Sequence, residues 1–304
     1  MTHIIKPIAI TDAMLTSSTL AEDTTSAWTS ATYAVGDYRH VVSTHRVYKC
    51  AVAGSRTISP ELDPTNWVDT RPTNKWAPFD IYTSTAATTV TSMTYVLTPG
   101  YFNAIALYGL TGIQYTLTVK DVSGGSTIYS SSGYLYEDPI GWYEYLFGGV
   151  TVVDQLVFAD IPIRPAAELT LTITAASGQP VGLGLVAMGD FQSLFGAGDW
   201  GGAQYGATAE PVTYSYIKTA DDGTTTIVRR HAATNLRITV TMPRDQADGV
   251  LQNLQSVLDV PVAIIVSSVS GFRKLSAFGL ISSAPVSYDS FGHANLNLTA
   301  KGLV

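Results

Sequence analysis

The chain has 304 residues, more than a single hydrophobic core usually holds, so we expect two or three domains. Charged residues make up 13% of it, while Thr, Ser, Gly and Tyr are plentiful, which favours β-sheets that present hydroxyl groups. The net charge of −7, without any Lys/Arg cluster, argues against nucleic acid as a partner, and the single cysteine excludes an internal disulfide framework and a multi-cysteine zinc site.

The first 24 residues alternate loosely between apolar and polar side chains and predict one or two strands without a core of their own. We expect these strands to complete a sheet formed later in the chain. Residues 1–21 contain Asp12 where a secretory signal would be continuously apolar, and no apolar run approaches the ~18 residues of a membrane span. The sequence therefore predicts a protein that folds in the cytosol without membrane insertion.

Residues 25–76 consist of short runs broken by glycine and proline, which predicts a small module with tight turns and little regular structure. A module of this size buries little apolar surface, so its large aromatic residues are needed as a core. Four residues fit that interpretation: Trp28, Tyr33, Tyr48 and Trp67. The alternative is that some of these rings, together with Trp76 and Tyr38, form an exposed platform on which a sugar ring stacks.

The order of residues in this module resembles the small carbohydrate-binding modules attached to bacterial chitinases and cellulases. The pattern is a Trp, then Tyr-x-x-Gly-Asp, a Tyr-Lys-Cys strand, a proline and a closing Trp, and it is carried by Trp28, Tyr33, Gly36, Asp37, Tyr48, Pro60 and Trp67. Asn66 stands where the family usually has an aromatic residue. The resemblance implies a carbohydrate-binding surface with five candidate residues: Trp76, Tyr38, Trp28, Tyr48 and Trp67.

Residues 77–190 have the length and alternation of a β-sandwich, which the N-terminal strands would complete around the inserted module. In ELTLTITA, Leu169, Leu171 and Ile173 fall on one face of a strand and threonines on the other. The stretch IQYTLTVKDVSGGSTIYSS predicts two strands joined through Gly124-Gly125. The glycines of GLGLVAMG have no helix after them, so we interpret this segment as a strand rather than a phosphate-binding loop.

Residues 191–212 are rich in glycine and predict a linker, or an arm that becomes ordered against a neighbour. Residues 213–304 predict a sheet with one amphipathic helix, an α+β unit suited to assembly. The helix is indicated by apolar residues at steps of three and four, namely Ala247, Val250, Leu251, Leu254, Val257 and Leu258. The fold class expected for the whole chain is mainly β.

Catalytic and metal-binding patterns are largely missing from the sequence. The histidines at positions 3, 40, 45, 231 and 293 have no metal-ligand spacing on a helix, and Cys50 is interpreted as a buried, inert thiol. The stretch YLYEDPIGWYEY places Glu137, Asp138 and Glu144 among aromatic residues, as in a glycosidase cleft, although a loop of aromatics on a sandwich is more often an interface. We expect no catalytic residues, metal or cofactor.

A second resemblance extends over more of the chain. The stretches IIKPIAITDAMLTSSTLAED, RPTNKWAPFD, TPGYFNAIALYGLTG and TLTVKDVSGGSTIYSS are similar to a structural protein in the tails of siphovirus-like bacteriophages, in which a carbohydrate-binding-like module is inserted near the start of a β-sandwich. The C-terminal unit also resembles the tail-tube and distal-tail fold. The most specific piece is Asn-Lys-Trp-Ala-Pro-Phe-Asp, residues 74–80.

This resemblance implies a non-enzymatic component of a phage tail tip or baseplate, assembled in the host cytoplasm and located in the virion. Its expected partners are further copies of itself in a trimer or hexamer, other tail proteins, and host cell-surface glycans. Two alternatives stay open: a glycan-degrading enzyme with an attached binding module, and an architectural protein in which the module is a spacer.

Overall fold

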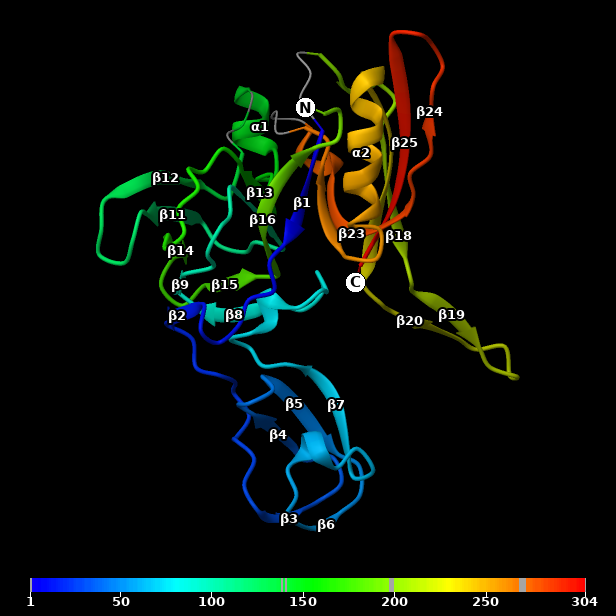
Figure 1. The fold of residues 1–304 in the computed structure, drawn as a ribbon. Coiled ribbons are helices and arrows are strands. Elements are labelled where there is room, and N and C mark those ends of the chain that lie inside the picture. Colours follow the sequence, from blue (N-terminus) through cyan, green and yellow to red (C-terminus); the bar gives the residue numbers. More distant parts are fainter. Residues whose placement is uncertain (1, 138, 140, 197–199, 268–271, 304) are drawn as a thin grey trace.

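The computed structural model describes residues 2–137, 139, 141–196, 200–267 and 272–303, except for the side chain of Glu144. The protein is mainly β, as the composition predicts (Figure 1). The largest sheet has eleven strands. Its main path runs through β13 (Gln155–Phe158), β10 (Ala104–Tyr108), β16 (Leu185–Ser193), β1 (His3–Pro7), β22 (Val262–Ile265), β23 (Ser276–Ser283), β25 (His293–Gly302), β21 (Ala232–Pro243) and β17 (Gly202–Ala203), with β18 (Thr208–Thr213) also on β21 and β24 (Val286–Ser287) on β25.

Strand β1 makes this sheet continuous across the predicted domain boundary. It pairs antiparallel with β16 on one side and with β22 on the other, so that Ile5 faces both Phe191 and Ala263. Ile4 and Ile5 are both fully buried, on opposite faces of the sheet. The first strand therefore does more than complete the sandwich, because it also joins the sandwich to the C-terminal unit.

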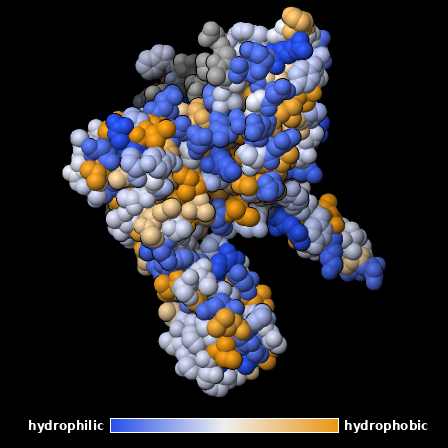
Figure 2. Space-filling view, viewed as in Figure 1, coloured by the Kyte–Doolittle hydropathy of each residue, from blue (hydrophilic) through white to orange (hydrophobic). Residues whose placement is uncertain are grey.

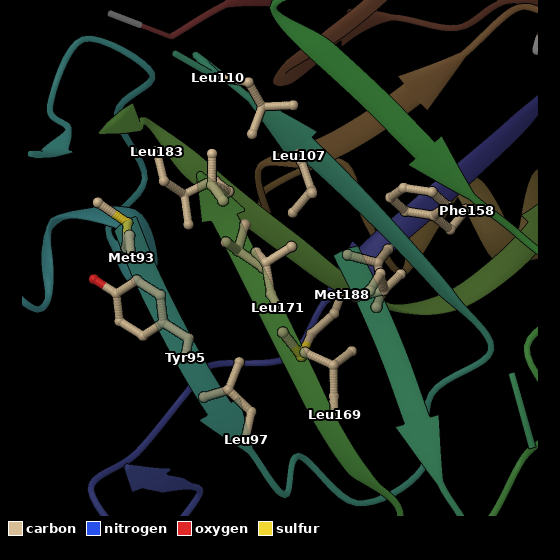
Figure 3. Close-up of a cluster of buried hydrophobic side chains, with 14 of the residues drawn as sticks. Met93, Tyr95, Leu97, Leu107, Leu110, Phe158, Leu169, Leu171, Leu183 and Met188 are labelled. Carbon is tan, nitrogen blue, oxygen red and sulfur yellow. The ribbon is translucent and has the colours of Figure 1, made fainter. Parts of the chain in front are cut away.

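The sandwich has a second sheet, which faces β10 and β16. Its strands are β12 (Thr127–Tyr134), β11 (Gln114–Lys120), β14 (Glu168–Thr174), β9 (Ser92–Leu97) and β2 (Leu15–Ser18), and β8 (Ala87–Val90) pairs separately with β15 (Pro180–Leu183). Leu171 lies between Leu117 and Tyr95 in register, and all three are buried in the core shown in Figure 3. The predicted face of β14 and the β11–β12 hairpin are confirmed.

The C-terminal unit packs one helix on its sheet. Helix α2 (Ala247–Gln255) follows the short turn η3 (Arg244–Gln246), and its side chains Ala247, Val250 and Leu254 are buried against β21, β22 and β25 (Figure 1). The predicted helix is confirmed. Its apolar stripe ends earlier than the sequence indicates, because Leu258 lies beyond α2 and is exposed.

The described part of residues 191–212, expected to be a linker or an arm, is largely paired. Strand β16 continues to Ser193, and β17 and β18 both pair with β21. Glycine is required here by close approach rather than for flexibility: Gly201 has a φ of +132°, and a Cβ on it would lie 2.8 Å from the Thr241 carbonyl oxygen. The projecting arm of the molecule lies further along the chain.

That arm is the hairpin of β19 (Tyr216–Thr219) and β20 (Thr225–Val228), which extends away from the body (Figure 1). A second unexpected element is helix α1 (Trp142–Phe147), formed where the sequence predicts a loop. No glycine or proline lies within α1, whereas Gly141 and Gly148 flank it, which confines the helix to less than two turns.

The small module forms a separate lobe, which lies below the sandwich in the view of Figures 1 and 2. It has a three-stranded sheet, β4 (Tyr38–Val41), β5 (Arg46–Cys50) and β7 (Trp67–Pro72), a two-stranded one, β3 (Ala31–Tyr33) and β6 (Gly54–Arg56), and the turn η1 (Pro60–Leu62). Two further short turns complete the described elements, η2 (Ala77–Phe79) and η4 (Arg273–Leu275).

Candidate functional site

The aromatic core of the module determines which of its rings remain exposed and able to contact a ligand. Tyr33, Tyr48 and Trp67 are buried together with Val41 and Cys50, and the rings of Tyr33 and Trp67 meet edge to face at 5.1 Å. Trp67 is 2% exposed, and Trp28 packs half-buried against the same cluster. This arrangement is the compact core that a small module needs, so most of the recognisable aromatic residues hold its fold.

The Tyr-x-x-Gly-Asp pattern forms the turn that leads into β4. Gly36 adopts a φ of +98°, a conformation that favours glycine, and its N–H donates to the Cys50 carbonyl oxygen at 2.8 Å. Asp37 Oδ2 accepts a hydrogen bond from the Ala34 N–H at 2.9 Å. Both contacts satisfy backbone groups of the turn, which gives this pattern a structural role.

One face of the module's sheet carries an exposed aromatic ring beside a lysine. Strand pairing places Tyr38 opposite Lys49, and Lys49 opposite Val68, so the three side chains form a row across β4, β5 and β7, which we call the outer row. Tyr38 is 43% exposed and Val68 53%, and the Lys49 ammonium lies 5.7 Å from the centre of the Tyr38 ring. A flat ring and an aliphatic side chain in one exposed row can contact the apolar face of a sugar.

Trp76 belongs to the joint between the module and the sandwich. It is 7% exposed, because the His45 ring stacks on it at 4.0 Å and Phe79 meets it edge to face at 5.6 Å. Phe79 in turn contacts Tyr95 in the sandwich core. Burial, together with the negative charge of Glu22, raises the pKa of the Tyr95 hydroxyl well above its usual range, and this hydroxyl donates to the Lys75 carbonyl oxygen.

Polar groups complete the joint around His45. Its Nδ1 lies 2.8 Å from Glu22 Oε1 and its Nε2 lies 2.7 Å from Asp12 Oδ1, so both ring nitrogens face a carboxylate of the body segment. Glu22 also accepts a hydrogen bond from the Thr73 hydroxyl and lies 3.7 Å from the Lys75 ammonium. These contacts connect the segment through which the chain enters the module, at Glu22, to the segment through which it leaves, at Thr73 and Lys75.

Asp23 also connects the two chain segments that enter and leave the module. Its side chain has no exposed surface, and it accepts hydrogen bonds from Arg71, from Thr25 and from the Asn74 N–H. Burial alone would raise the pKa of this carboxyl, but the hydrogen bonds outweigh burial and lower the pKa to about 2. The joint therefore holds an ionised, buried carboxylate.

The structure separates the five candidate residues of the sequence into three environments. Tyr38 presents its ring to solvent, Trp28 is half-buried, and Tyr48, Trp67 and Trp76 are buried. The last three cannot offer a face for stacking, because their rings are covered by the module core or by the joint. Lys49 and Val68 were missed by the sequence analysis, and the strand register that would have revealed them depends on turns that the sequence does not specify.

The carboxylates of the predicted cleft lie near helix α1. Glu137 Oε1 lies 3.3 Å from an Arg273 nitrogen, which pairs its charge, while Asp138 and the side chain of Glu144 lie outside the described residues. Within the described ranges, no group of three or more His, Cys, Asp or Glu side chains could hold a metal ion. No helix of the described part of the chain is long and apolar enough to cross a membrane.

Comparison with known proteins gives a weak structural similarity. No protein-family model and no curated protein matches the sequence. Two structures of chitosan-binding module 1 from a chitosanase/glucanase of Paenibacillus sp. IK-5 match. A selenomethionine-labelled mutant has a TM-score of 0.25 at 13% identity, and an unlabelled form 0.24 at 16%, each match covering 37% of this chain and 81% of that module.

Proposed function

We propose that this chain is a structural protein of a bacteriophage tail tip or baseplate. In this proposal, three or six copies assemble into a ring in the host cytoplasm, contact other tail proteins in the virion, and carry the small modules outward to host surface glycans. The sequence resemblance over residues 74–80 supports the tail assignment, and in the fold Lys75, Trp76 and Phe79 of this stretch lie in the joint between the module and the sandwich.

The observation that carries the assembly proposal is the β19–β20 hairpin. Ile217 and Ile227 pair directly across it and are 66% and 64% exposed. An isolated two-stranded hairpin is marginally stable in water, and an exposed pair of isoleucines adds an apolar surface that a partner would cover. Figure 2 shows the hairpin as a projection beyond the body, where a neighbouring copy can reach it.

The assembly proposal is tested by sedimentation velocity on the full chain at about 50 μM. We expect the wild type to sediment as a trimer or hexamer, and the double variant Ile217→Thr/Ile227→Thr as smaller species, because threonine keeps the strand preference but removes apolar surface. Val90→Thr is the matched control, since Val90 is another exposed strand residue outside the hairpin. A wild type that stays monomeric, or a double variant that assembles normally, argues against the hairpin as the contact.

The glycan proposal rests on the exposed ring of Tyr38. Its test is retention of the full chain on immobilised bacterial surface polysaccharide. Tyr38→Ala should elute several-fold earlier, because a stacking contact contributes on the order of 1 kcal/mol, whereas Tyr101→Ala, which removes an exposed ring outside the module, should elute like the wild type. Equal retention of the two variants contradicts a binding role for Tyr38 and favours the spacer interpretation.

A further inference from the structure

We propose that the outer row binds acidic polysaccharides, in which a carboxylate is attached to the sugar ring, in preference to neutral ones. This inference rests on the proposed glycan contact and specifies its ligand class. The Tyr38 ring and Val68 supply the surface for the sugar's C–H groups, and the Lys49 ammonium beside the ring supplies the partner for the carboxylate.

Two cations of β4 and β5, Arg39 and Lys49, have no carboxylate partner among the described residues. Lys49 and Arg39 form no salt bridge with any carboxylate of the described residues, whereas Arg46, Arg71 and Lys75 of the same module are each paired. Arg39, the next residue along β4, has its side chain on the opposite face of the sheet, where it lies over the buried Tyr33 ring at 5.0 Å and donates to the Tyr38 carbonyl oxygen. Lys49 is therefore the cation of the outer row, beside the exposed Tyr38 ring and without a carboxylate partner among the described residues.

The net charge of the module differs in sign from that of the chain. Residues 25–76 contain six Lys or Arg and four Asp or Glu, a net charge of +2, while the whole chain carries −7. The body therefore repels an acidic polymer at long range, and the module is the part that attracts it. Two acidic residues of the joint, Asp12 and Glu22, contact His45, which directly precedes β5. Lys49 lies toward the other end of β5, so these carboxylates lie away from the outer row along that strand.

The Lys49 ammonium can have a favourable contact both in the free site and in the site with a bound sugar. Without ligand, its ammonium lies over the Tyr38 ring, where the negative face of the aromatic system attracts it. The lysine stem has four rotatable bonds, so the ammonium can swing from the ring to a carboxylate without a change of the backbone. Stacking on Tyr38 and charge pairing with Lys49 then act on one sugar unit.

The experiment measures dissociation constants of the full chain for polygalacturonate and hyaluronan, each compared with its carboxyl-reduced, neutral form, at about 50 and 300 mM NaCl. We expect each acidic polymer to bind at least about fivefold more tightly than its reduced form at low salt, with the preference shrinking at high salt. Lys49→Gln should remove most of the preference, and Lys301→Gln, which deletes an exposed positive charge outside the module, should retain it. Tyr38→Ala should weaken binding of both forms.

Three outcomes overturn the inference in distinguishable ways. Equal affinity for acidic and reduced polymers, insensitive to salt, contradicts the charge preference but leaves glycan binding in place. A preference that survives Lys49→Gln contradicts the assignment to the outer row. Failure of the wild type to bind any of the four polymers rejects the glycan contact of the proposed function together with this inference.

Discussion

Two aromatic residues of the same module have opposite environments. Trp67 is enclosed by the module core, whereas Tyr38, at the start of β4, lies in the exposed outer row. Composition and motif spacing identified both as important but could not separate them, because a motif that defines a small fold and a motif that binds a ligand use the same residue types. Strand register makes the distinction, because Trp67 pairs with the buried Cys50 whereas Tyr38 pairs with the exposed Lys49.

Truncation of the two rings should therefore have different effects on stability. We expect Trp67→Ala to destabilise the module by about 3–5 kcal/mol, as is usual for removing a large buried aromatic side chain, and Tyr38→Ala by less than about 1 kcal/mol. Hydrogen exchange of the backbone amides of β4, β5 and β7 measures both effects. Protection that survives Trp67→Ala would show that the ring is not part of the core.

The buried carboxylate Asp23 should make the joint sensitive to acid. Its pKa is about 2 in the folded protein, below the ordinary value of 3.8, so its stabilising contribution is fully present above about pH 4 and is lost as the pH falls toward 2. In urea titrations, Asp23→Asn should be less stable than the wild type by roughly 1–3 kcal/mol at pH 7, with the gap closing in that acid range. The matched control is Glu210→Gln, which removes an exposed carboxylate that has no salt bridge among the described residues.

At the scale of elements, the sequence predicted those with strong periodicity and little dependence on distant partners. The β11–β12 hairpin, strand β14 and helix α2 are found where alternation or three-and-four spacing indicates them. Helix α1 was missed because six residues are too few for a helical period to emerge, and β17 and β18 because their pairing with β21 depends on contacts that local composition does not encode.

The contacts of the joint should hold the module in one orientation relative to the body. His45→Phe keeps an aromatic ring to stack on Trp76 but removes both polar contacts, to Glu22 and Asp12. We expect faster reorientation of the module relative to the body, measured by ¹⁵N relaxation of its amides, with the module core intact. His231→Phe, at an exposed position in the body, should tumble like the wild type, and an unchanged module in His45→Phe would mean that the two polar contacts of His45 do not fix its orientation.

At the scale of the whole molecule, one continuous sheet links the sandwich to the C-terminal unit, and two parts project from it. The sequence indicated separate domains because each has its own hydrophobic pattern, yet β1, with a partner on each side, merges their sheets. Long-range pairing of this kind leaves no local signature. The module and the β19–β20 hairpin project from this shared body in different directions (Figure 1).

In the proposed function, this chain forms a symmetric assembly of copies that carries the small modules outward. Electron micrographs of the purified full-length protein at micromolar concentration test it most directly. We expect closed rings of three or six copies, with the modules projecting from the ring and the β19–β20 hairpins at the contacts between copies. Fields of single, unassociated particles across the accessible concentration range would contradict it.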